Sequence, residues 1–219
     1  MEDFVQQLSV WALPVLAAII LHEVSHGFVA YQFGDTTAAR AGRLTLNPIP
    51  HIDPLGTVLL PLVLILMQAP FLFGWARPVP VNYAYLRNPK RDMVLVAAAG
   101  PATNILLAIV SAVIFRLLMQ VELRPDGTLT APLVAGLTPL TMMAQNSVVV
   151  NVVLAVFNLL PILPLDGGRV LAGLLPLRQA AAFVRLEPFG MIIVIMLLAT
   201  NALDLVVGPL VHAFLRVLL

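Results

Sequence analysis

Five consecutive residues inside an apolar run, His22-Glu23-Val24-Ser25-His26, have the types and spacing of a metal site. On a helix, positions i and i+4 share one face, so both imidazoles can reach a single zinc ion. Glu23 projects about 100° away from that face, close enough to act on a water at the metal. The pattern is typical of metallohydrolases. The alternative is that the three side chains only hydrogen-bond to one another inside a helical bundle.

A catalytic zinc ion has three protein ligands and one open position, so a further ligand is needed. The chain contains no cysteine, which leaves histidine and carboxylate donors. Those at membrane depth or at its edge are His51, Asp53, Asp166, Asp204 and His212. Asp166 is favoured because a proline-rich segment precedes it and two glycines follow it, which opens the helix and requires a polar cavity. The alternative for Asp166 is the start of a helix or an Asp-Gly turn.

The elements that must position these residues are membrane helices. Of the 219 residues, 60% are hydrophobic and 11% are charged, whereas soluble domains carry about 25% charged residues. We expect an all-α polytopic membrane protein with about four to six membrane helices, forming a single membrane-embedded domain over residues 1–219. Runs long enough to span the membrane occupy residues 8–33, 93–119, 137–160 and 188–207.

The basic residues orient these helices, because they mark cytoplasmic loops. Nine of the twelve lie in three connections, around residues 40–43, 77–91 and 169–185. Two of these connections flank a further apolar run at residues 55–73, which contains two prolines. A re-entrant hairpin keeps both connections on one side and brings Asp166 to the face where His26 lies. A full crossing would separate the two by most of a bilayer of about 30 Å.

Two short segments, residues 42–46 and 77–82, are bounded by turn-forming residues and rich in β-branched residues or proline. Both patterns are typical of short strands. We therefore expect a small β-sheet at the cytoplasmic interface, with the prolines of the second segment at its edge.

Three motifs resemble the signature blocks of the site-2 protease family of intramembrane zinc metalloproteases: His22-Glu-Val-Ser-His26, Gly100-Pro-Ala-Thr-Asn104 and Asn158-Leu-Leu-Pro-Ile-Leu-Pro-Leu-Asp166-Gly-Gly-Arg169. They occur in the family's order and span nearly the whole chain. The segment from Leu44 to Gly56 also resembles one found in the short prokaryotic members, whereas the PDZ and CBS domains of other branches are not seen.

The resemblance implies peptide-bond hydrolysis within the membrane, acting on membrane-spanning protein substrates. It implies one Zn²⁺ held by His22, His26 and Asp166, with Glu23 as the general base. It also implies a multi-pass protein of the cell membrane, expected to be a prokaryotic inner membrane, with the active site toward the cytoplasm.

Three further polar residues are candidates for orienting the substrate. Asn104 and Asn158 lie in apolar helices, where an amide either bonds a neighbouring helix or serves the site. The resemblance favours the second role for both, and it gives none to Asn151, which we expect to be structural. His51 lies in an extended, proline-rich segment and either contacts the substrate or caps a turn.

Two other functions fit parts of the pattern. A transporter or channel also uses broken helices and intramembrane ionisable residues, but the chain shows no paired half-repeats. A catalytically silent metal-binding scaffold would not need Glu23. With a formal net charge of +1, no nucleic-acid partner is expected, and the sequence leaves the oligomeric state open.

Overall fold

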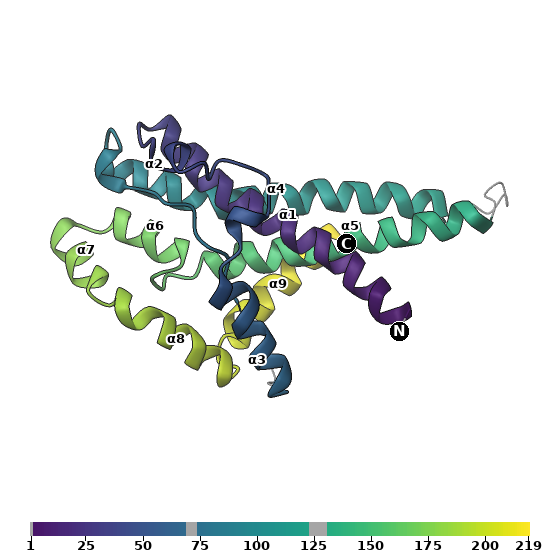
Figure 1. Ribbon diagram of the computed structural model, residues 1–219. Helices are drawn as coiled ribbons and strands as arrows, with labels where there is room; N and C mark the ends of the chain where they lie inside the picture. Colours follow the sequence, from purple (N-terminus) through teal and green to yellow (C-terminus); the bar gives the residue numbers. More distant parts are fainter. Residues whose placement is uncertain (1, 69–73, 123–130) are drawn as a thin grey trace.

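The computed structural model describes the backbone of residues 2–68, 74–122 and 131–219, and the side chains of residues 9–68, 74–121 and 136–219 (Figure 1). Its helices are α1 (Glu2–Gln32), α2 (Thr37–Arg40), η1 (Ile49–His51), η2 (Pro54–Leu59), α3 (Leu60–Leu66), η3 (Tyr83–Tyr85), α4 (Pro89–Glu122), α5 (Ala131–Asn158), α6 (Asp166–Leu174), α7 (Leu177–Val184), α8 (Glu187–Ala199) and α9 (Asp204–Leu218). Helices α1, α4 and α5 pack together as the centre of the fold. The all-α prediction is confirmed for the described residues.

Three helices are long and apolar enough to cross a membrane: Ser9–Gln32, Pro89–Val121 and Gly136–Asn158, with 24, 33 and 23 residues. They match three of the four predicted spans. The predicted span at residues 188–207 is wrong as one straight helix, because α8 ends at Ala199 and Asn201 turns the chain with φ 54°. Helices α7 and α8, bent by 62°, could together form a fourth crossing. Within the described residues, the expected four to six spans are thus reduced to three or four.

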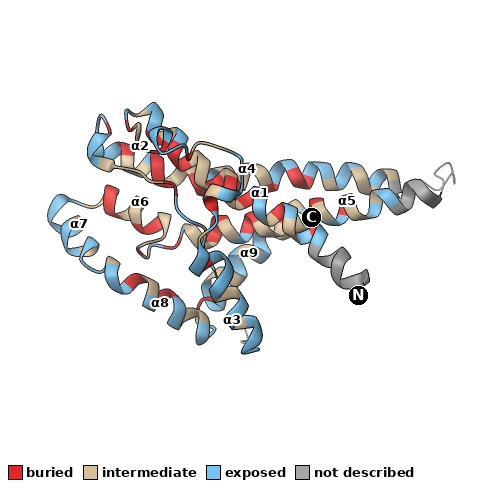
Figure 2. Ribbon diagram, viewed as in Figure 1, coloured by how far each residue is buried: buried red, intermediate tan, exposed pale blue. Residues whose placement is uncertain are grey.

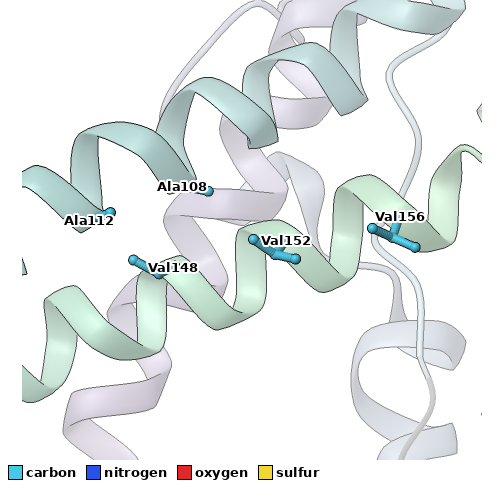
Figure 3. Close-up of a cluster of buried hydrophobic side chains, with 5 residues drawn as sticks. All are labelled: Ala108, Ala112, Val148, Val152 and Val156. Carbon is cyan, nitrogen blue, oxygen red and sulfur yellow. The ribbon is translucent and has the colours of Figure 1, made fainter. Parts of the chain in front are cut away.

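Small side chains let helices α4 and α5 approach closely. Figure 3 shows the shared cluster of Ala108, Ala112, Val148, Val152 and Val156, which are all buried. Their spacing of four places the alanines on one face of α4 and the valines on one face of α5. Lipid gives helices no hydrophobic reason to associate, so close van der Waals packing of this kind must hold them.

The outer surface carries many large apolar side chains. Buried residues gather where the central helices cross, and exposed ones cover the outward faces (Figure 2). Leu66, Leu177, Leu205 and Val217 are each more than 70% exposed. An apolar surface of this extent belongs in hydrocarbon rather than in water, which supports the prediction of a polytopic membrane protein.

The expected small β-sheet is not supported. Residues 42–46 and 77–82 both belong to the described part of the chain, and neither contains a strand. Pro78 and Pro80 have no N–H to donate to a ladder. The N–H groups of Arg77 and Asn82 bond elsewhere, to the carbonyl oxygen of His51 at 2.8 Å and to Asp35 Oδ2 at 2.6 Å.

The run at residues 55–73 folds back on itself as far as it is described. Helices η2 and α3 together cover Pro54–Leu66, too short to cross a bilayer, and residues 69–73 lie outside the described part. The chain returns beside its starting point, where Trp75 N donates to Gly56 O at 3.1 Å and Thr57 Oγ1 donates to Trp75 O at 2.8 Å. These contacts give the segment the hairpin geometry that the charge pattern predicts.

A proline-rich turn connects α5 to α6, which packs against α4. A side chain at Gly167 would overlap the carbonyl oxygen of Leu159, and one at Gly168 would lie 2.6 Å from the backbone of Ile162. Only glycine therefore allows α6 to begin so close to the turn. This close approach fixes Asp166, the first residue of α6, relative to the bundle.

Candidate metal centre

Helix α1 and the start of α6 bring His22, His26 and Asp166 together. The Nε2 atoms of the two histidines are 3.1 Å apart, and Asp166 Oδ2 lies 3.1 Å from His22 Nε2 and 3.3 Å from His26 Nε2. The imidazole rings are nearly perpendicular, at 83°, so they present their Nε2 edges to one point. Both histidines are buried, with 7% and 8% of their surface exposed.

The protein fixes which ring nitrogen of each histidine is free. His26 Nδ1 lies 2.7 Å from the carbonyl oxygen of Val96, and His22 Nδ1 lies 2.5 Å from Asn104 Oδ1. Each partner is an oxygen that only accepts, so each Nδ1 must carry the proton and donate it. In the neutral rings, both Nε2 atoms then present lone pairs toward the same carboxylate oxygen. Hydrogen bonds of this kind orient the histidines of metal sites.

This donor set fits a metal ion. Two Nε2 lone pairs and a carboxylate oxygen are all acceptors. Asp166 Oδ2 is a buried oxygen that has no hydrogen-bond partner among the described residues. A cation at their centre would satisfy all three. Ligands bound to zinc at about 2.05 Å with tetrahedral angles lie about 3.3 Å apart, close to the observed 3.1 to 3.3 Å. Among the described residues, these three form the one cluster of this type.

Gly100 on α4 provides the space beside the histidines. A Cβ atom at this position would overlap His26 Nε2 and would lie 2.6 Å from His22 Nε2. The missing side chain is thus required by the ligand atoms themselves. The sequence alone does not predict this role, because the spacing of a motif on one helix does not reveal what the opposite helix carries.

Glu23 is held beside this centre by the extended segment that follows the hairpin. Its Oε2 accepts a hydrogen bond from Val79 N at 2.8 Å, which leaves Oε1 for another partner. Arg43 secures that segment, because its guanidinium donates to the carbonyl oxygens of Arg77 at 2.6 Å and Pro78 at 3.3 Å. Burial, followed by the charge of Arg77, lowers the pKa of Arg43 from its ordinary value, and Glu23 opposes this effect.

Asn104 contacts a histidine rather than open space. It is fully buried, its Oδ1 accepts from His22, and its Nδ2 donates to Ala18 O at 3.3 Å and to Asn151 Oδ1 at 2.8 Å. These bonds use both N–H groups of the amide and one lone pair of Oδ1, which leaves at most one lone pair for the predicted substrate contact. Asn151 donates in turn to Ser147 O at 2.8 Å. This chain of bonds joins three different helices, so it could not be predicted from the sequence.

Asn151 therefore has a testable effect on metal binding. Replacing Asn151 with alanine removes the acceptor for Asn104 Nδ2 and loosens the bond that orients His22. We expect zinc affinity to fall about tenfold, at the lower end of the range for groups that support metal ligands, as measured by competition with a chromophoric chelator. Asn146→Ala is the matched control, because Asn146 joins α5 to Val10 O of α1 at 3.2 Å without touching the centre. Equal affinities in the two variants would contradict the assignment.

The other candidate residues lie elsewhere. Asn158 ends α5 and donates to Leu154 O at 3.0 Å, within its own helix. Asp53 caps η2 by accepting from Leu55 N and Gly56 N, and Asp204 and His212 are exposed on α9. His51 is buried, and its Nε2 lies 3.0 Å from Thr45 O. None of these residues joins the cluster of His22, His26 and Asp166.

The fold and the cluster define a helical membrane protein with a buried site for a metal ion, and comparison with known proteins gives its family. The model of Peptidase family M50 matches residues 10–200. The chain therefore belongs to this family, the site-2 protease family, and is of the zinc metalloprotease type.

Individual relatives agree with this assignment. The chain is 37% identical to "Putative zinc metalloprotease YwhC" of Bacillus subtilis over 201 residues, covering 92% of this chain and 85% of that protein. It is 30% identical to "Putative zinc metalloprotease Rip2" of Mycolicibacterium smegmatis over 189 residues, covering 86% of this chain and 66% of that protein. The protein of the same name from Mycobacterium tuberculosis is 30% identical, with 92% and 69% covered. No solved structure gives a significant match.

Proposed function

We propose that residues 1–219 form one membrane-embedded endopeptidase domain that hydrolyses peptide bonds of membrane-spanning substrates. His22, His26 and Asp166 hold one zinc ion, and Glu23 is the general base. The observation that carries the proposal is the meeting of two Nε2 lone pairs with a carboxylate oxygen, next to Glu23. Ionisable groups inside an apolar helix are costly and are found where function requires them.

The three ligand residues set the charge of the site. Two neutral imidazoles and one carboxylate contribute a single negative charge, so a divalent cation leaves the centre net positive. When bound, zinc supplies a Lewis acid that polarises the scissile carbonyl and makes water more acidic. Val96 O and Asn104 Oδ1 hold the histidines in the tautomer that this role requires.

Glu23 performs the proton transfers in this proposal. Its Oε2 is held by Val79 N, so Oε1 is the atom that accepts the proton of the attacking water. The same carboxyl group then gives the proton to the leaving amine, as a general acid. Asn158, at the end of α5 beside the turn that leads to Asp166, is proposed to orient the substrate backbone.

The location is also proposed. The three basic connections support a protein of the cell membrane whose metal centre lies toward the cytoplasm. Such a site can cut a helical substrate only after local unwinding, because helical peptide bonds are shielded by their i to i−4 hydrogen bonds.

Metal removal tests this function. The purified protein is placed in lipid vesicles with a single-span model peptide, and cleavage is followed by mass spectrometry. Treatment with 1,10-phenanthroline is expected to stop cleavage, and stoichiometric zinc is expected to restore it. Calcium, which prefers six to eight oxygen ligands, is the control and should not restore it. Cleavage that continues after the metal has been removed would contradict the proposal.

A further inference from the structure

A cavity of about 290 Å³ lies between α1 and the hairpin. Its walls come from Val15, Leu16, Ile19 and Ile20 of α1, and from His51 and Trp75 on the opposite side. The lining is mainly apolar. A dry cavity of about 150 Å³ accommodates a benzene molecule, so this one has room for a leucine or phenylalanine side chain.

Two parts of the chain connect this cavity directly to Glu23. Ile19 and Ile20 precede Glu23 by four and three residues, so they lie one helical turn, about 5.4 Å, away along the same face. On the other wall, Ala76 lines the cavity and Val79, three residues later, bonds the Glu23 carboxylate. Three residues of extended chain span at most about 10 Å. A peptide with its scissile bond at Glu23 would therefore place a nearby side chain at the cavity.

His51 gives this cavity a polar atom that has no hydrogen-bond partner among the described residues. The residue is 3% exposed, and its Nε2 must carry the proton because it donates to the carbonyl oxygen of Thr45 at 3.0 Å. The other nitrogen, Nδ1, is then an acceptor, and it is buried without a hydrogen-bond partner in the part of the chain that the structure describes. A buried unsatisfied acceptor destabilises the folded state by about 1–3 kcal/mol, so such a group calls for a ligand that carries a donor.

This acceptor distinguishes between the two natural occupants of an apolar cavity in a membrane. A lipid acyl chain has no hydrogen-bond donor, whereas an unwound peptide exposes one backbone N–H at nearly every residue. We propose that the cavity is a specificity subsite for one large apolar side chain of the unwound substrate, and that His51 Nδ1 accepts the neighbouring backbone N–H. Because Nδ1 is covered in this state, the imidazole or its loop must shift slightly as the peptide enters. The proposal rests on the proposed function.

Hairpin glycines keep the far wall of the cavity in place. A Cβ atom at Gly56 would overlap the indole ring of Trp75, and one at Gly74 would lie 2.5 Å from Gly56 O. Trp75 is therefore packed directly on the backbone of η2. The part of the wall that Trp75 forms therefore has a fixed shape, which is what discrimination between side chains of different size requires.

The test varies the substrate and the cavity together. A single-span model peptide is first cleaved in lipid vesicles and its cut site is mapped. Each leucine near the cut site is then changed to alanine, and kcat/KM is compared between the peptides. For the parent, we expect one position at which alanine lowers kcat/KM about tenfold or more, as for loss of a buried apolar side chain. Ile19→Trp fills the cavity and should reduce that discrimination to less than about twofold. Ala17→Trp, at an exposed position of α1 outside the lining, should preserve it.

A matched pair of variants tests His51. His51→Gln retains an N–H for Thr45 O but offers no acceptor at the Nδ1 position, whereas His51→Asn places an oxygen near that position. The loss of one neutral hydrogen bond predicts that His51→Gln lowers kcat/KM about three- to tenfold on every peptide, with zinc content unchanged. The kcat/KM of His51→Asn should stay closer to that of the parent. Parent-like cleavage by His51→Gln would overturn the role of Nδ1.

The outcomes separate the two proposals. If the parent does not cleave any peptide, the proposed function fails and the subsite fails with it. If the parent cleaves and Ile19→Trp keeps the same preference with normal zinc content, only the subsite is wrong. Lipid that co-purifies with the parent and is lost in Ile19→Trp, with unchanged residue preference, would show that an acyl chain occupies the cavity and would also overturn it.

Discussion

Glu23→Gln is expected to abolish cleavage while leaving zinc bound. Glutamine has nearly the same shape, and its amide oxygen can still accept the hydrogen bond of Val79 N, which is 2.8 Å from the carboxylate in the parent. The amide cannot take up a proton, so the general-base step is lost. Such a loss lowers rates by about 10²- to 10⁴-fold. The turnover of a single-span peptide in vesicles and zinc per chain by mass spectrometry would measure both effects on the same sample.

The control for this variant removes another carboxylate. Asp204→Asn changes an exposed residue at the start of α9, and its turnover should equal that of the parent. Cleavage by Glu23→Gln within about tenfold of the parent would remove Glu23 from its role as the base. Loss of zinc from Glu23→Gln would show instead that this carboxylate supports metal binding.

Gly100→Ala is expected to disrupt the metal centre by a single methyl group. The added Cβ would overlap His26 Nε2 and approach His22 Nε2 to 2.6 Å, so at least one imidazole must leave the position where it faces Asp166. Moving a ligand out of place should lower zinc affinity by about 10- to 100-fold, the range seen when ligand orientation is disturbed. Competition with a chromophoric chelator would measure the affinity, and circular dichroism would show that the helices remain.

Gly136→Ala is the matched control for Gly100→Ala. Both glycines lie in long membrane helices, but a Cβ atom at Gly136 would contact no described atom within 4 Å outside its own helix backbone and chain neighbours. Alanine there should leave zinc affinity unchanged and favour the helix slightly. Parent-like zinc binding by Gly100→Ala would mean that the histidines do not need the space that this glycine leaves.

The residues of the centre were predictable because their chemistry is local. The spacing of His22 and His26 places both on one helical face whatever the fold around them. Asp166 could be predicted from the topology. The few basic residues mark the cytoplasmic loops, and the prolines and glycines mark the broken helix. The same charges predicted that the run beginning at residue 55 turns back, and Trp75 does return to bond the backbone of Gly56.

Features that depend on contacts between distant segments were not predictable. The prediction of two strands was wrong. The side chain of Arg43 bonds the carbonyl oxygens of residues 77 and 78, which backbone N–H groups would bond in a sheet. Asn104 was expected to face the substrate, and only the packing of three helices shows that its amide is bonded to His22 and Asn151. The division of residues 188–207 arises at Asn201, whose positive φ is set by the turn and not by any hydropathy pattern.

X-ray absorption at the zinc edge, recorded on the purified protein loaded with one equivalent of zinc, would show whether His22, His26 and Asp166 bind the metal. We expect stoichiometric binding, with two imidazole nitrogens at about 2.0–2.1 Å and carboxylate oxygen at about 2.0–2.2 Å. These are the donors that meet in the structure, His22, His26 and Asp166. Zinc that fails to bind, or that binds with one imidazole or none, would contradict this assignment.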